Sequence, residues 1–180
     1  MKRLFIAALL VAATTGCTTM KPETFAQGTP AFDVFEYFIG TTRAWGVFED
    51  RFGTIRRQFT VDIHGEVRDG ELVLEESFQF ADGETDHRTW TIRRDGEGGY
   101  RGTAGDIIGE AVGRAAGNAL NWRYDMDLEM GDNTLRVTFD DWMLLQADGV
   151  LINRAWVKKF GIEIGSVSIF FKQQDTGPEA

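Results

Sequence analysis

Charged side chains interrupt several apolar stretches of this sequence, and they are the groups whose types could do chemistry. Glu76 and Asp141 could serve together as general acid and base if the fold brings the two carboxyls close together. Arg154 or Lys158 could instead receive the carboxylate head of a ligand. A third interpretation needs no ligand, because buried charges must be paired and these groups could simply neutralise one another. In that case the cations would lower the pKa of both acids, which does not suit a general acid.

Other catalytic chemistries have little support in the sequence. A serine-histidine-acid relay or a histidine metal site needs histidine in a cluster. The chain has only two histidines, His64 and His87, and both are predicted to lie on the polar face of a strand. No GxSxG, Walker or dinucleotide-binding motif is present. We therefore expect no cofactor and no bound metal, and we keep a carboxylate-based enzyme acting on a lipid as an alternative.

The elements that must position these groups are strands, because apolar and polar residues alternate along the chain. The clearest alternation runs over residues 59–67 and ends at Asp69-Gly70, which is a favoured two-residue hairpin turn. This turn predicts that Ile63 lies opposite Glu76 and that Val67 lies opposite Leu72. One face of the hairpin is then apolar, apart from Glu76.

The next connection sets the position of Arg88. A three-residue loop at residues 82–84 keeps Trp90 on the apolar face, opposite Glu76, and places Arg88 diagonally beside that acid. Glu76 would then have a cationic partner on the same face.

A second acid is predicted on the same inner face. Turns at residues 132–133 and 148–149 place Tyr124 and Trp156 opposite Asp141, with cations on its diagonals. The candidate ligand-binding residues are therefore Glu76, Arg88, Trp90, Trp122, Tyr124, Asp141, Arg154, Trp156 and Lys158.

About eight to ten strands, linked mostly by hairpins, account for the domain. Closure into a barrel removes exposed sheet edges, so we predict an all-β, lipocalin-like up-and-down barrel, with a two-sheet sandwich as the alternative. The exception is the segment 105–119, where glycines recur every four residues. We predict a short helix or loop there, packed against the barrel or acting as a mobile lid.

The N-terminus has the pattern of an export signal. Lys2 and Arg3 precede an apolar run from Leu4 to Ala13, which is too short to span a bilayer, and Cys17 follows soon after. This arrangement resembles a bacterial lipobox, which implies cleavage before Cys17, acylation of that residue and sorting to the outer membrane. Cleavage nearby by an ordinary signal peptidase is the alternative.

Four segments follow from these patterns. Residues 1–16 are the predicted signal peptide, 17–29 the lipidated cysteine with a linker, 30–173 the barrel domain and 174–180 a disordered tail. Without residues 1–16 the chain has 17 basic and 28 acidic residues, a net charge of −11. Such a surface repels nucleic acid and anionic lipid, so we expect the tether rather than the body to hold the protein on a membrane, facing the periplasm.

Several longer stretches carry a family resemblance. They are residues 46–53, 88–90, 113–122, 139–143 and 153–161. Together they resemble a family of proteobacterial lipoproteins known only as a domain of unknown function, family 3833, over about residues 32–173. The resemblance implies no activity and no catalytic residues. Members of this family are often encoded near fatty-acid-modifying enzymes, which implies a lipid ligand by association only.

Three functions remain open. The first is a barrel that binds an apolar or fatty-acid-like ligand, either a fatty acid or a phospholipid, which predicts an internal cavity. The second is an interaction lipoprotein with a filled core and an exposed aromatic patch, for which Trp45 and Trp142 are candidate contacts with unknown protein partners. The third is the enzyme, which predicts a carboxyl with a raised pKa.

Overall fold

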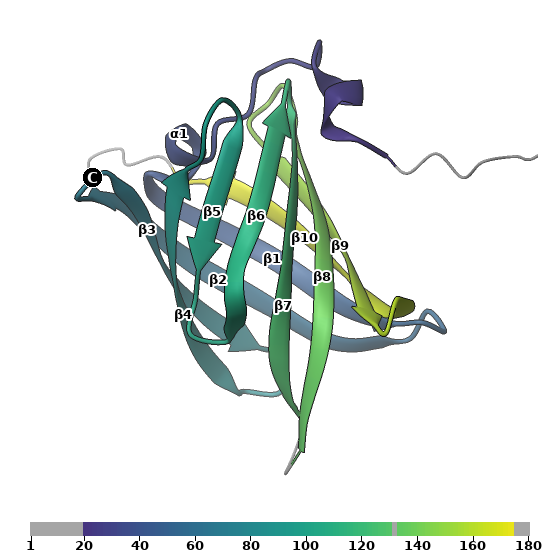
Figure 1. Cartoon of the computed structure of the whole chain (residues 1–180). Helices are drawn as coiled ribbons and strands as arrows, with labels where there is room; N and C mark the ends of the chain where they lie inside the picture. Colours follow the sequence, from purple (N-terminus) through teal and green to yellow (C-terminus); the bar gives the residue numbers. More distant parts are fainter. Residues whose placement is uncertain (1–19, 131–132, 175–180) are drawn as a thin grey trace, which may run out of the picture.

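The computed structural model describes residues 20–130 and 133–174, and within them the chain forms one closed barrel. Each strand pairs antiparallel with the next, and β1 pairs with β10 to close the ring (Figure 1). The up-and-down barrel predicted from the alternation is confirmed, and the sandwich is excluded. The strands are β1 Gly40–Asp50, β2 Ile55–Arg68, β3 Glu71–Phe80, β4 Thr85–Arg94, β5 Gly99–Thr103, β6 Ile107–Ala116, β7 Ala119–Met130, β8 Asn133–Leu145, β9 Leu151–Lys159 and β10 Ile162–Gln173.

The first hairpin has the predicted register. Asp69 and Gly70 both have positive φ, 53° and 84°, which is the geometry that an aspartate-glycine turn favours. Ile63 pairs with Glu76, and Val67 pairs with Leu72, as expected. The turn sequence alone was therefore sufficient to align β2 with β3.

Two predicted registers are shifted by two residues. The β3–β4 loop is Ala81–Gly83, because the Phe80 N–H donates to the Glu84 oxygen. Arg88 therefore lies directly opposite Glu76 rather than diagonal to it, and Trp90 lies opposite Leu74. The faces stay as predicted because a shift of two preserves the alternation.

The β7–β8 hairpin shows the same shift. Met130 pairs with Asn133, which is two residues from the predicted register. Tyr124 consequently lies opposite Phe139, and Asp141 lies opposite Trp122.

The β8–β9 prediction is wrong by one residue, which reverses a strand's faces. The connection is the three-residue loop 147–149, closed by the Gln146 N–H donating to the Val150 oxygen. Asp141 therefore pairs with Ala155, while Trp156 pairs with the outward-facing Asp140. Arg154, Trp156 and Lys158 lie on the outside of the barrel, in contrast to the prediction.

The helix or loop predicted for residues 105–119 is also wrong, because most of this segment is strand β6. A bulge interrupts its pairing near Gly109, whose φ is +72°. Gly113 faces inward, and a Cβ there would lie 2.3 Å from the Trp122 ring. The glycines therefore form a bulge and a turn, and allow close packing against the Trp122 indole. Their four-residue spacing resembles a helical stripe, and the spacing alone does not distinguish these two arrangements.

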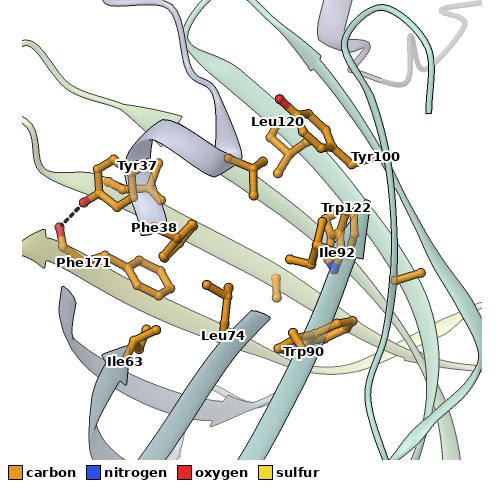
Figure 2. Close-up of a cluster of buried hydrophobic side chains, with 14 of the residues drawn as sticks. Tyr37, Phe38, Ile63, Leu74, Trp90, Ile92, Tyr100, Leu120, Trp122 and Phe171 are labelled. Carbon is orange, nitrogen blue, oxygen red and sulfur yellow. Dashed lines mark hydrogen bonds between the residues drawn. The ribbon is translucent and has the colours of Figure 1, made fainter. Parts of the chain in front are cut away.

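One end of the barrel is covered by the short helix α1, Val34–Phe38 (Figure 1). Asp33 caps this helix by accepting from the Phe35 and Glu36 amides, and it also binds Arg94. The Tyr37 hydroxyl donates to the Phe171 oxygen at 3.1 Å. Figure 2 shows Tyr37 and Phe38 packed among the large apolar side chains of the core at this end.

A 3₁₀ turn, η1 at Pro22–Phe25, precedes α1. Phe25 packs against Trp142 on the outer surface, with ring centroids 5.8 Å apart. Trp142 is buried for this reason, so it does not belong to an exposed aromatic patch as the interaction hypothesis predicted. The predicted signal peptide and Cys17 lie outside the described residues. Among those residues, none belongs to a helix with the length and apolarity needed to cross a bilayer.

Candidate functional site

A polar cluster lies inside the barrel, between the core beneath α1 and the end opposite that helix. Strands β3 and β4 supply Glu76 and Arg88, which face one another across the pair. Arg88 Nη2 also lies 2.5 Å from a carboxylate oxygen of Asp106, in the β5–β6 connection. Strands β7 and β8 add Tyr124 and Asp141, whose hydroxyl and Oδ2 are 3.5 Å apart. The polar cluster thus combines three carboxyls with one guanidinium.

Burial dominates the acid–base properties of Glu76. It raises the pKa of this carboxyl from an ordinary 4.5 to about 7, and the negative charge of Asp106 acts in the same direction. Arg88 opposes this shift but does not overcome it. The prediction that cations lower this pKa is therefore wrong, because desolvation outweighs the single neighbouring cation.

Asp141 follows the same rule. Burial raises its pKa from 3.8 to about 7, and hydrogen bonds from Asn153 and Tyr124 only partly offset that effect. Arg154 and Lys158 were expected to lower the pKa, but they are on the outer face. The same burial, together with the Asp141 charge, raises the pKa of Tyr124 well above 10.

Several polar atoms of this cluster have no partner among the described residues. They are Arg88 Nε, Asp106 Oδ1, Asp141 Oδ1 and Asn153 Oδ1. An unsatisfied buried polar atom costs about 1–3 kcal/mol, and such atoms are uncommon in folded proteins. The cluster can therefore still accept hydrogen bonds from, and donate them to, a polar group.

Aromatic rings surround the polar cluster. The Trp90 ring lies 5.5 Å from that of Tyr124 and 5.7 Å from that of Trp122, and Tyr124 stacks on Phe139 at 5.1 Å. Towards the end opposite α1, the inward-facing Phe59 and other side chains are only partly buried. The further members of this group are Phe48, Phe78, Leu128, Leu135, Ile164, Val167 and Ile169. The side chains of this half of the interior are therefore more exposed to solvent than those beneath α1.

Six of the nine candidate residues point into the barrel, and a role for them in ligand binding stays a prediction. They are Glu76, Arg88, Trp90, Trp122, Tyr124 and Asp141. The outer three belong to a surface feature instead. Lys158 binds Asp140 at 3.1 Å, and Arg154 lies over the Trp156 ring at 5.5 Å.

The sequence analysis missed Asp106 and Asn153. Asp106 lies in the segment that was predicted to be a helix or loop. No alternation of apolar and polar residues was assigned there, so the sequence did not indicate that its side chain points inward. Asn153 takes the inward position that the one-residue error had given to its neighbour. A three-residue loop at residues 147–149, instead of the predicted two-residue turn, gives the register that places Asn153 inside the barrel. Predicting that loop length would therefore have identified Asn153.

The outer surface carries two shallow grooves. One of about 240 Å³ lies over β7–β10 and is lined by Met20, Arg123, Asp140, Trp142, Trp156, Lys158 and Glu163. The other, about 360 Å³, lies near the β9–β10 turn. His64 and His87 are exposed, and no cluster of three or more potential metal ligands occurs within residues 20–130 and 133–174.

The family described as "Protein of unknown function (DUF3833)" matches residues 11–173, which confirms the family predicted from the sequence. Comparison with curated proteins gives no match.

Proposed function

Since the chain belongs to the family of proteins of unknown function DUF3833, which brings no activity with it, we propose a function from the geometry of the barrel. The barrel binds a small amphipathic molecule, with its polar head at the Glu76–Arg88 pair and its apolar body among the aromatic rings. The observation that carries this proposal is the set of buried polar atoms without partners in the middle of an apolar barrel.

The charges of the cluster select the head group. With Glu76 and Asp141 protonated, Asp106 and Arg88 balance one another, so the cluster is neutral and offers several hydrogen-bond donors. With both acids ionised, two further negative charges face the head group. A fatty-acid carboxylate therefore binds best below about pH 7, where both acids keep their protons.

The entry path follows from the way the two ends are closed. Helix α1 and its contacts fill one end of the barrel. The partly buried aromatic side chains line the half that leads to the other end, over which the described residues place no helix. A ligand therefore enters opposite α1 and stops at the polar cluster.

A titration with cis-parinaric acid, a fluorescent fatty acid, tests the proposal. The probe should quench Trp90 and Trp122 fluorescence and bind about tenfold more tightly at pH 5 than at pH 9. Oleyl alcohol, which cannot ionise, should compete equally well at both pH values. Probe binding that is weak and independent of pH would contradict the proposal.

Three matched variants identify the site. Arg88→Gln should weaken binding, and Glu76→Gln should reduce its pH dependence, because each changes a group inside the barrel. Arg154→Gln is the control, since its side chain is on the outer face. Equal effects of Arg88→Gln and Arg154→Gln would exclude the interior as the binding site.

We further propose that the protein is an outer-membrane lipoprotein, anchored through Cys17 and facing the periplasm. The support is the order of Lys2 and Arg3, the apolar run and the cysteine. An acylated cysteine would hold the protein on a bilayer, because each buried methylene contributes about 0.8 kcal/mol.

The raised pKa values also favour a second function, a lipid-acting enzyme. A carboxyl with a pKa of about 7 can donate a proton near neutral pH, and Glu76 has this property in an apolar surrounding. Turnover of an ester-linked lipid that disappears in Glu76→Gln would establish this alternative. Reversible binding without turnover would support the carrier.

A further inference from the structure

Two neighbouring hairpin tips at the end opposite α1 expose large apolar side chains. Phe160 is 92% exposed and Phe52 is 79% exposed, with Ile162 at 64% and Ile55 at 52%. Isolated apolar residues on a surface are ordinary, but four on adjacent turns form a patch. We call these four residues the apolar tips.

The two hairpins are held together by the closure of the barrel. Strand β1 pairs with β10, and the Arg51 N–H donates to the Ile164 oxygen at 3.0 Å. Figure 1 shows the β1–β2 and β9–β10 turns side by side at the lower right. The apolar tips therefore lie on one side of the rim.

The backbone conformation at Phe160 does not favour a phenylalanine at this position. Phe160 and Gly161 form a two-residue loop with φ of 51° and 78°, nearly the geometry of Asp69 and Gly70. Aspartate tolerates a positive φ, whereas a bulky aromatic residue adopts it only at a cost. Since Phe160 is also 92% exposed, neither the turn nor core packing accounts for it.

A cation accompanies each aromatic tip. The Arg51 guanidinium lies 4.9 Å from the Phe52 ring centroid, and the Lys159 ammonium lies 5.4 Å from that of Phe160. Neither cation forms an ion pair with a described residue, whereas the nearby Lys158 is paired with Asp140. Aromatic rings beside unneutralised cations are typical of segments that enter the interface of an anionic bilayer.

We propose that the apolar tips insert into the surface of an anionic lipid bilayer. Phe52 and Phe160 enter the head-group region, while Arg51 and Lys159 reach the lipid phosphates. The contact is one-sided, because residues 81–84 at the neighbouring β3–β4 connection expose no large apolar side chain and carry Asp82 and Glu84, which pair with Arg57. This local contact differs from the expectation, based on net charge, that the body avoids anionic lipid.

The start of the described chain lies along an outer groove that extends towards the Phe160 tip. Met20 lines the same outer groove as Lys158 and Glu163, which are close in sequence to the Phe160 tip. Two residues separate Cys17 from Met20, and the three residue steps span at most about 11 Å. With the apolar tips inserted, the uncovered end of the barrel faces the lipid.

The test uses the full chain with an environment-sensitive nitrobenzoxadiazole label at one turn. Phe160→Cys reports on the apolar tips, and Asp69→Cys is the matched control, because it occupies the same turn geometry at the opposite end. The chain without either substitution measures any labelling of Cys17. The vesicles contain phosphatidylglycerol, phosphatidylethanolamine and a spin-labelled lipid that quenches the probe.

The probe at position 160 should be quenched several-fold more than the probe at position 69. This difference should decrease in Arg51→Gln/Lys159→Gln, and when phosphatidylcholine replaces phosphatidylglycerol. Equal quenching at both positions would overturn the proposal, since a tether alone would explain it. The proposal would also be overturned if the probe at position 160 reports an apolar environment in the absence of vesicles, because that result would indicate contact with a second copy of the chain. Neither outcome depends on whether the barrel binds a ligand.

Discussion

Replacing Glu76 by glutamine should stabilise the protein at high pH and leave it nearly unchanged in acid. The folded state raises the pKa of Glu76 from 4.5 to about 7, so the folded protein holds this proton more tightly than the unfolded chain. The free energy of unfolding therefore decreases as the pH rises through this interval, and it levels off above it. Glutamine has the shape of the protonated acid and does not ionise.

The magnitude follows from the size of the shift. A change of this size corresponds to about 3 kcal/mol, because each pKa unit is worth about 1.4 kcal/mol. Roughly 2 kcal/mol of this should develop between about pH 5 and about pH 8, since the unfolded chain is already partly ionised at the lower value. Arg88 keeps Asp106 as a partner in the variant, so no cation is left unpaired.

Urea unfolding of the two proteins at both pH values measures the difference. Glu75→Gln is the control, because Glu75 lies on the same strand but is exposed, and its variant should change by less than about 0.5 kcal/mol. A Glu76→Gln variant whose stability relative to the wild type is the same at both pH values would refute the reasoning. It would mean that Glu76 is ionised in the folded state at both pH values.

Three other predictions concern packing and processing. Gly113→Ala should destabilise the barrel by about 1–3 kcal/mol, because its Cβ would meet the Trp122 ring at 2.3 Å, whereas Gly105→Ala, with open space around it, should be nearly neutral in the same urea assay. Phe25→Ala should shift tryptophan emission to longer wavelength by uncovering Trp142, and an unchanged spectrum would show that η1 does not cover this ring. Cys17→Ser should leave the precursor unprocessed or release the protein from the membrane fraction, and normal processing with membrane attachment would exclude acylation at that residue.

The barrel was predictable because its signal is local and repeated. Alternation over residues 59–67 and the Asp69-Gly70 turn determine a hairpin without any knowledge of the remaining chain, and β2 and β3 pair accordingly. Three-residue loops are harder to place, since Gly83 and Gly149 can each close loops that differ by one residue. At Gly83 the register error was two residues, an even number, so each side chain stayed on its predicted face of the sheet.

The candidate site was only partly predictable for the same reason. At Gly149 the error was odd, so it moved Arg154, Trp156 and Lys158 from the outside to the inside. Arg154 and Lys158 therefore do not lie beside Asp141 inside the barrel. The pKa of Asp141 is raised rather than lowered as predicted. Asp106 contributes from a connection between strands, where no periodicity indicates which side chains point inward.

The cell-envelope location and the ligand depend on chemistry that the fold does not determine. An up-and-down barrel accommodates many functions, so the argument for a ligand rests on the unpaired polar atoms around Arg88 and Asp141. A filled, non-catalytic interior would have to satisfy those atoms by other means.

The most direct test of the ligand-binding account is native mass spectrometry of the full chain, purified from the envelope of a bacterial host, followed by solvent extraction. The account predicts a stoichiometric amphipathic molecule that is lost in Arg88→Gln and retained in Arg154→Gln. A protein of wild-type stability with a clean unliganded mass, in both the wild type and the variants, would contradict it.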